Sequence, residues 1–286
     1  MKARIIATGS YLPEKILSNA DLEKIVDTSD EWIVSRTGMK ERRIAGDNES
    51  NSDLGSFAAK NALEKTSLES GDIDYIIVAT ITPDYPFPST ACLVQKKLGL
   101  VNAAAVDIQA TCSGFLYALD MAKAFVESGR YKNVLVIASE KLSSIVDYQE
   151  RTTCVLFGDG AGAVLLEPNT EGLGFQDEYL RSDGSGREFL KIEAGGSILP
   201  PSHETVDNKQ HFVHQDGRTV FKFAVSNMAD VCEKIMQRNY LSHDDVSWLV
   251  PHQANMRIID ATANRMNLQD DKVLKNIHRY GNTTSA

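Results

Sequence analysis

Hydrophobic residues form short continuous runs that alternate with stretches of amphipathic spacing. The runs predict buried strands at residues 75–79, 103–108, 134–138, 161–166 and 248–250, after a strand-like run at 3–7. The amphipathic stretches predict helices from about 52 to 65, from 114 to 127 and from 221 to 236. Because strands alternate with helices, we expect an α/β layer architecture.

Several polar and glycine positions mark where these elements begin, end or pack. Ser18 with Asp21 resembles a capping box, Ser52 is expected to precede a helix, and Gly129 to close the helix from Gly114. Phe and Met positions within 221–236 recur at helical spacing, which predicts core packing. The glycines at 158, 160 and 162 lack the Lys-Ser/Thr of a phosphate-binding loop and predict tight backbone packing.

An internal repeat indicates two similar halves. Residues 68–77 align without gaps on residues 241–250, a displacement of 173 positions (241 minus 68), and both stretches lead from a helix into a predicted strand. We therefore expect halves at 1–170 and 171–286. A complete second half would extend to about residue 340, so we expect this chain to be truncated at its C-terminus.

Composition and charge narrow the classes of function. The 286 residues are 42% hydrophobic and 24% charged, as in globular proteins. A net charge of -9 argues against general binding to nucleic acid, which needs clustered Lys and Arg. No apolar run could cross a bilayer and no secretion signal is present, so we expect a soluble, cytoplasmic protein.

The cysteines and histidines give little support for metal sites or disulfides. Cysteines 92, 112, 154 and 232 have no C-x-x-C spacing, which favours reduced thiols. The pair His211 and His214 has no third ligand at a recognised spacing, so we expect no metal site.

Cys112 is the first candidate for chemistry. It follows a predicted buried strand and precedes a predicted helix, with small residues between them. A thiol at a helix N-terminus is expected to have a lowered pKa, and sharp strand-to-helix turns often expose a nucleophile. The alternative is a small buried hydrophobic residue, a common role of cysteine. This segment alone leaves both interpretations open.

Two further segments carry candidate residues near the end of the chain. His252 lies in Pro251-His-Gln-Ala-Asn255, just past a predicted strand, where α/β folds collect ligand contacts. Asn282 lies in a loop marked by Gly281. Taken singly, a structural histidine and an asparagine in a turn are common.

Taken together and in order, the segments Ala-Thr-Cys-Ser-Gly-Phe, Pro-His-Gln-Ala-Asn and Gly-Asn-Thr-Thr-Ser-Ala resemble the condensing enzymes of the thiolase superfamily. The resemblance spans the chain and is specifically to the 3-oxoacyl-[acyl-carrier-protein] synthase III family. It implies a thiolase-like fold, two similar halves in a layered α-β-α-β-α arrangement. It also implies a catalytic set formed by Cys112, His252 and Asn282.

The resemblance implies a decarboxylative Claisen condensation that initiates fatty acid synthesis. Cys112 would take the acyl group of a short acyl-CoA, most simply acetyl-CoA. His252 and Asn282 would donate hydrogen bonds to the thioester oxygen of malonyl-acyl carrier protein as carbon dioxide leaves, and the product would be 3-oxoacyl-carrier protein. Coenzyme A is then part of a substrate, and no cofactor is implied.

The resemblance also assigns binding residues. Trp32 would stack on the adenine of coenzyme A, and Arg36 and Arg151 would contact phosphate. The residues expected to line the pantetheine tunnel are Thr28, Gly217, Phe221, Asn255 and Arg257. The basic residues expected to dock the acidic carrier protein are Lys222, Arg257, Arg265 and Lys272.

A homodimer is implied as well, because the segment 82–89 would cross to the other subunit and Phe87 would close the partner's acyl pocket.

Three alternatives stay open. A thiolase would need a second cysteine near the C-terminus, and a polyketide-type synthase would share the Cys/His/Asn set but use other acyl partners. The family's Gly-rich loop that supports the oxyanion at Cys112 has no counterpart in these residues. The third alternative is therefore a truncated, inactive form that binds acyl-CoA or carrier protein.

Overall fold

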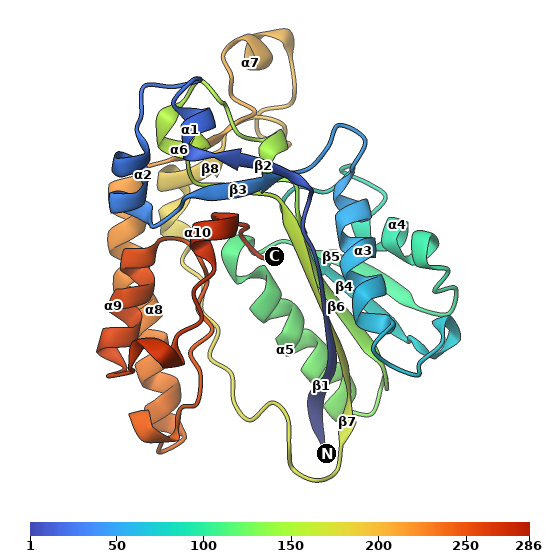
Figure 1. The fold of residues 1–286 in the computed structure, drawn as a ribbon. Helices are drawn as coiled ribbons and strands as arrows, with labels where there is room; N and C mark the ends of the chain where they lie inside the picture. Colours follow the sequence, from blue (N-terminus) through green and yellow to red (C-terminus); the bar gives the residue numbers. More distant parts are fainter.

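The computed structural model describes residues 1–286, and its centre is a five-stranded mixed sheet in the order β1-β7-β6-β4-β5 (Figure 1). Strand β4 runs parallel to β5 and β6, whereas β7 runs antiparallel to β6 and β1. The bounds are β1 (Lys2–Tyr11), β4 (Tyr75–Ala79), β5 (Ala104–Ile108), β6 (Val134–Glu140) and β7 (Gly160–Asn169).

Helices cover both faces of this sheet, because successive side chains of a strand point to opposite sides. Ile76 and Val78 of β4 belong to the core packed against α3 (Asn51–Leu63) and α4 (Thr90–Leu98). Ile77 and Ala79 belong to the core on the other face, under α5 (Gly114–Glu127). Figure 1 shows α3 and α4 on one side of the sheet and α5 on the other. The continuous apolar runs of the sequence are explained by burial on both faces.

The predicted elements of the first half are confirmed with small changes in their bounds. The strand at 75–79 has the predicted limits, and those at 103–108, 134–138 and 161–166 differ from the observed strands by one to three residues at an end. The Ser18–Asp21 capping box is confirmed and caps the N-terminus of α1 (Asn19–Leu22). Gly129 follows α5 with φ 71°.

One helix start was predicted two residues late. Ser50, not Ser52, caps α3, since the Ser50 side chain accepts from the backbone N–H of Asp53. Ser52 lies inside the helix and donates instead to Asp84 (2.6 Å).

The remaining elements surround the sheet. Two small sheets pair β2 (Lys15–Ser18) with β3 (Glu41–Ile44) and β8 (Leu190–Ile192) with β9 (Val213–Gln215). The other helices are α2 (Asp30–Thr37), α6 (Arg151–Cys154), α7 (His203–Asp207), α8 (Gly217–Arg238), α9 (Met256–Arg265) and α10 (Ile277–Tyr280). Helices α8 and α9 pack together beyond α5 (Figure 1). None of the helices combines the length and the hydrophobicity needed to cross a membrane.

Of two predictions for the second half, one is wrong and one is confirmed in part. The stretch 248–250 is not a strand, since only Leu249 makes a bridge, to Val273, while Trp248 and Val250 are 63% and 70% exposed. A strand needs a paired neighbour along its length, and here the pairing is limited to Leu249. Core packing along α8 is confirmed only in part. Met236 packs against a buried hydrophobic cluster, whereas Ala229 is the only fully buried residue of the helix and Phe223 is 53% exposed.

The internal repeat is visible only in part. Both copies form a short 3-10 turn, at Ser70–Asp72 and His243–Asp245. In each turn the aspartate accepts from the backbone N–H three residues earlier, Asp72 from Glu69 and Asp245 from Ser242. The likeness therefore extends through the turn but not to the strand that follows it in the first copy.

Candidate active site

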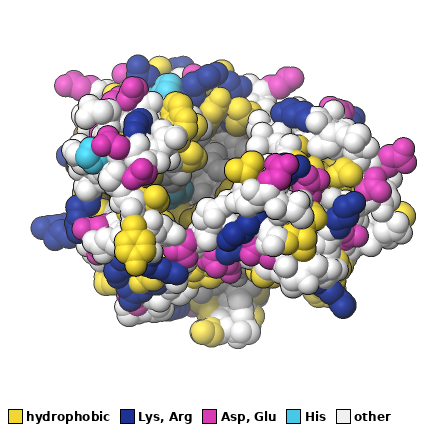
Figure 2. Space-filling view, turned by 90° about the horizontal axis from the view of Figure 1, so that it is seen from below, with side chains coloured by type: hydrophobic (Ala, Val, Ile, Leu, Met, Phe, Trp, Pro, Cys, Tyr) yellow, Lys and Arg dark blue, Asp and Glu magenta, His cyan; other side chains and the backbone are white.

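A cavity of about 940 Å³ opens between the central sheet and α8 and α9, and Figure 2 shows the molecule hollowed on that face. Three segments far apart in the sequence meet in its lining, through Cys112, His252 and Asn282. Predicted binding residues that also line it are Trp32, Arg36, Gly217, Phe221, Asn255 and Arg257. Tertiary folding thus brings the predicted catalytic set to one site.

Cys112 lies in a tight turn between β5 and α5. Thr111 to Ser113 form a single 3-10 turn, and Thr111 has φ 44°, in the left-handed region that non-glycine residues rarely adopt. A Cβ atom on Gly114, where α5 begins, would lie 3.2 Å from Ala79 Cβ and 3.4 Å from Ser285 Cβ. The sharp turn predicted for the nucleophile is confirmed, and close packing favours glycine after it.

The predicted lowering of the Cys112 pKa is wrong. Burial and the negative charge of Glu140 raise the pKa of this thiol to about 12. The helix itself begins only at Gly114, two residues beyond the cysteine. Cys112 is therefore a thiol at neutral pH, and its proton must leave when it attacks a substrate.

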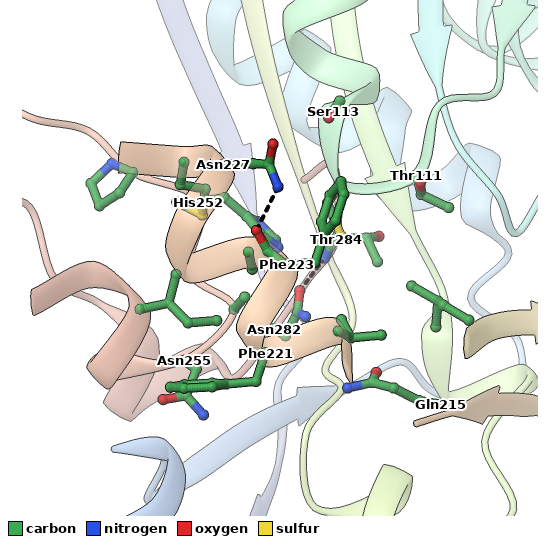
Figure 3. Close-up of a pocket in the computed structure, with 18 of the residues that line it drawn as sticks. Thr111, Ser113, Gln215, Phe221, Phe223, Asn227, His252, Asn255, Asn282 and Thr284 are labelled. Atoms are coloured by element: carbon green, nitrogen blue, oxygen red, sulfur yellow. Dashed lines mark hydrogen bonds between the residues drawn. The ribbon is translucent and has the colours of Figure 1, made fainter. Parts of the chain in front are cut away.

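His252 is neutral in this environment. Burial lowers the pKa of its imidazole to about 4. Its Nε2 atom is buried and has no hydrogen-bond partner within the protein, although the residue lines the cavity. Figure 3 shows the ring facing the cavity beside Asn227, whose amide donates to the carbonyl of Phe223 (2.9 Å). The unpaired ring nitrogen is thus positioned to bond with a substrate.

Asn282 is held by backbone bonds to the segment before β7. Its N–H donates to the Leu156 carbonyl (2.9 Å), and its carbonyl accepts from the Gly158 N–H (3.0 Å). A Cβ atom on Gly158 would lie 2.4 Å from the Tyr280 carbonyl oxygen, which confirms the predicted tight packing at this glycine. The same prediction is wrong for Gly162, where a Cβ atom would meet no other atom within 4 Å. The side-chain Oδ1 of Asn282 accepts from the Thr284 N–H (Figure 3). The amide NH₂ group remains as the donor toward the cavity.

A cluster of cationic and aromatic groups lies at one end of the cavity. The Trp32 ring has two guanidinium groups over it, those of Arg36 and Arg151, each 5.0 Å from the ring centroid. The Arg257 guanidinium lies 4.6 Å from the centroid of Phe221. Positive charge beside flat aromatic surfaces suits a ligand with both phosphate and an aromatic base.

Other predicted binding residues do not line the cavity. These are Thr28, Arg151, Phe87, Lys222, Arg265 and Lys272. Arg265 forms ion pairs with Asp230 (3.3 Å) and Glu233 (2.7 Å), and Lys272 donates to the Val246 carbonyl (2.8 Å). The cationic groups of Arg265 and Lys272 therefore already have partners within the chain.

Three residues at the site were not predicted from the sequence. Asn227 lines the cavity from the face of α8 that carries Val220, Ala224 and Val231, so a polar residue on an apolar stripe was the available signal. Thr284 lies in the same loop as Asn282. Glu140 ends the buried strand β6, where a charged residue at the carboxyl end was the signal.

No group of three or more His, Cys, Asp or Glu side chains lies close enough together to hold a metal ion. Of the histidine pair considered above, His211 hydrogen-bonds through Nε2 to Thr205 Oγ1 (2.9 Å).

Comparison with known proteins identifies the family. The model for 3-oxoacyl-[acyl-carrier-protein] synthase III matches residues 106–184, and the model for its C-terminal part matches residues 236–286. A beta-ketoacyl-[acyl-carrier-protein] synthase III of Chlorobium chlorochromatii is 58% identical across all of this chain and 88% of its own length. This chain belongs to the 3-oxoacyl-[acyl-carrier-protein] synthase III family.

Solved structures of synthase III proteins share the fold. The enzyme of that name from Aquifex aeolicus is 46% identical and superposes with a TM-score of 0.91, over 99% of this chain and 87% of its own. A priming beta-ketosynthase of the R1128 polyketide pathway is 32% identical, also with a TM-score of 0.91. The expected thiolase-like α/β fold of the synthase III family is confirmed.

Proposed function

We propose that this chain condenses a short acyl-CoA, most simply acetyl-CoA, with malonyl-acyl carrier protein and so initiates fatty acid synthesis. The observation that carries this proposal is the meeting of Cys112, His252 and Asn282 in one cavity, a thiol beside two neutral polar groups. Membership of the synthase III family supports it, as do relatives named for this activity.

In the first step Cys112 attacks the carbonyl carbon of the acyl-CoA. A bond forms between its sulfur and the acyl carbon, and the bond between that carbon and the sulfur of coenzyme A breaks. The thiol proton of Cys112 ends on the departing coenzyme A thiolate. A thiol with a raised pKa supplies this proton without any change in net charge.

In the second step malonyl-carrier protein loses carbon dioxide. The electron pair of the broken carbon-carbon bond forms an enolate, whose oxygen accepts hydrogen bonds from His252 and from the Asn282 amide. The enolate carbon then attacks the acyl-cysteine, the carbon-sulfur bond breaks, and Cys112 takes up a proton. A neutral His252 suits this role, because it donates a hydrogen bond without having to transfer a proton.

We assign the binding of acyl-CoA and of the carrier protein to two different sets of residues. We propose that Trp32, Arg36 and Arg151 hold the nucleotide end of coenzyme A. Gly217, Phe221 and Asn255 line the route of the pantetheine arm, with Thr28 beside it. For the carrier protein, Arg257 and Lys222 carry more weight than Arg265 and Lys272, whose cationic groups already contact partners within the chain.

The organisation proposed for the chain is two halves, 1–170 with Cys112 and 171–286 with His252 and Asn282, acting as a homodimer. Two observations support the dimer. Strand β5 is an edge of the central sheet, so its outer backbone groups are free to pair. Phe87 is 85% exposed, which is costly for a large apolar side chain unless a partner covers it. The chemistry needs a reduced Cys112, which favours a cytoplasmic location.

Mass spectrometry of the intact protein tests the proposal. After incubation with acetyl-CoA we expect the mass of one acetyl group, confined to the peptide with Cys112. Addition of malonyl-carrier protein should remove that mass and give 3-oxobutyryl-carrier protein. A stable acyl adduct with no condensation product would instead support a binding form without turnover, and absence of the adduct would contradict the proposal.

A polyketide-type priming function is the second candidate, because a priming ketosynthase of that class shares the fold at 32% identity. Offering longer acyl-CoA starters, and malonyl-CoA in place of malonyl-carrier protein, distinguishes the two. Preference for acetyl-CoA with malonyl-carrier protein favours the initiating function.

A further inference from the structure

Glu140 is a fully buried carboxylate for which the reaction above has no role. It ends strand β6, next to the floor of the cavity, and no Lys, Arg or His pairs with it. Charged groups are rarely buried unless other groups compensate for the lost hydration. The contacts of Glu140 should therefore show why a carboxyl group is buried at this position.

Uncharged donors from two segments surround the Glu140 carboxylate. Thr82 Oγ1 donates to it at 2.7 Å, and the Ile81 N–H at 3.1 Å, both from the loop after β4. Thr80 Oγ1 donates at 3.1 Å. From the end of the chain, Ser285 Oγ donates at 2.9 Å. Burial raises the pKa of the Glu140 carboxyl, and these four hydrogen-bond donors oppose that rise.

The bond to Ser285 connects Glu140 to both catalytic segments. Ser285 follows Asn282 by three residues in the same loop, and Thr284 between them bonds to Asn282 Oδ1. Ser285 also packs against the start of α5, since its Cβ lies 3.4 Å from the Cβ position of Gly114, two residues after Cys112. Figure 1 shows the C-terminal end of the chain beside α5.

We propose that Glu140 is a positioning residue of the condensing site: through Ser285 it holds the Asn282 loop against the α5 start. It touches neither substrate. The groups that bond to it are three hydroxyls and a backbone N–H, and none of them is charged. The role rests on the proposed function only in taking Cys112 as the nucleophile and Asn282 as the donor.

The position of the Asn282 loop has a consequence for decarboxylation, because Asn282 supplies a hydrogen-bond donor in that step and not in acyl transfer. Three variants test the link between Glu140 and Ser285. Ser285→Ala removes the hydroxyl, Glu140→Asp withdraws the acceptor from it, and Glu140→Gln keeps an acceptor oxygen in an isosteric side chain.

The test measures two rates. The first is acyl transfer from acetyl-CoA to Cys112, followed by mass spectrometry of the intact protein. We expect Ser285→Ala, Glu140→Asp and Glu140→Gln to keep this rate close to that of the parent, because the Asn282 amide has no role in this step.

The second rate is decarboxylation of malonyl-carrier protein by enzyme already acylated on Cys112. We expect losses of about tenfold in Ser285→Ala and Glu140→Asp, as for one misplaced hydrogen-bonding group. Asp159→Asn is the matched control, because Asp159 is an equally buried carboxylate that bonds to Ser143 and Ala45 instead. It should leave decarboxylation close to the parent rate, which separates loss of the contact with Ser285 from loss of any buried carboxylate.

Decarboxylation at the parent rate in both Ser285→Ala and Glu140→Asp would overturn the proposal, and so would equal losses of acyl transfer and decarboxylation. Glu140→Gln should decarboxylate faster than Glu140→Asp, because its amide oxygen still accepts from Ser285. If Glu140→Asp does not fold, Ser285→Ala still decides the positioning role. If the parent protein forms no acyl adduct, the proposed function fails, whereas a parent that turns over normally beside unchanged variants overturns only the role of Glu140.

Discussion

The side-chain Oδ1 of Asn282 accepts a hydrogen bond from the backbone N–H of Thr284 at 2.9 Å. Thr284 has φ 50°, a left-handed conformation that is unusual for threonine. The loop thus maintains an unfavourable backbone angle where this contact forms, and the contact sets the orientation of the amide. An asparagine side chain with its oxygen occupied can offer only its NH₂ group to a substrate.

Replacing the Asn282 amide should remove an oxyanion donor. We expect Asn282→Ala to slow decarboxylation about a hundred- to a thousandfold, and Asn282→Asp at least as much, because a carboxylate oxygen would face the developing negative charge. Acyl transfer to Cys112 should change far less. Single-turnover measurements of both steps check this, with Asn276→Ala, outside the cavity lining, as the control. Equal losses in both steps would contradict the division of roles.

Burial of neutral His252 predicts a dependence of stability on pH. Its pKa is about 4 in the folded protein and 6.5 in the unfolded chain, so below pH 6.5 the unfolded state binds more protons. The contribution of His252 is present above pH 6.5 and is lost progressively as the pH falls toward 4. Urea unfolding of His252→Gln should show a weaker loss of stability over that interval than the parent. The same slope in both proteins would argue against a neutral, buried histidine.

Only one of the two thiols in the cavity should be acylated. Cys112 and Cys232 both line it, but Cys232 lies on α8, away from the turn that carries the nucleophile. We expect Cys112→Ser to abolish the acyl adduct from acetyl-CoA and Cys232→Ser to leave it intact, as seen by mass spectrometry. An adduct that persists in Cys112→Ser would reassign the nucleophile.

The stacked arrangement at Trp32 should contribute to acyl-CoA binding and not to chemistry. Two guanidinium groups, those of Arg36 and Arg151, lie 5.0 Å from the centroid of the Trp32 ring, so an aromatic surface and positive charge occur together here. Trp32→Ala should raise KM for acyl-CoA about tenfold with little change in kcat. Trp248→Ala is the matched control, since Trp248 is exposed and outside the cavity lining. A fall in kcat alone would contradict a binding role.

Docking of an acidic carrier protein should depend on cations that are not already paired. Arg265 contacts Asp230 and Glu233, whereas Arg257 forms no ion pair and lies over Phe221 at the cavity. We expect Arg257→Gln to weaken carrier-protein binding about fivefold and to reduce its salt dependence, with a smaller effect from Arg265→Gln. Binding titrations at low and moderate salt measure this. Equal effects of the two variants would mean that the ion pairs of Arg265 do not reduce its contribution to carrier-protein binding.

The sequence by itself determined the strands of the first half and the choice of the candidate catalytic set. The strands at 75–79 and 134–138 are buried on both faces, which is why their sequences are continuous hydrophobic runs of strand length. Cys112, His252 and Asn282 lie in short motifs that are ambiguous singly and become specific only together and in order. Both kinds of information are local in the sequence.

The tertiary structure alone decided the properties that depend on neighbours. The thiol pKa was predicted from the helix that follows Cys112, but burial and the charge of Glu140 outweigh it, and Glu140 is brought close by the pairing of β6 with β4. The stretch 248–250 has the composition of a strand but no partner to pair with along its length. Hydrogen bonding between strands and electrostatic energies depend on which groups come together in space, and a single stretch of sequence does not contain that information.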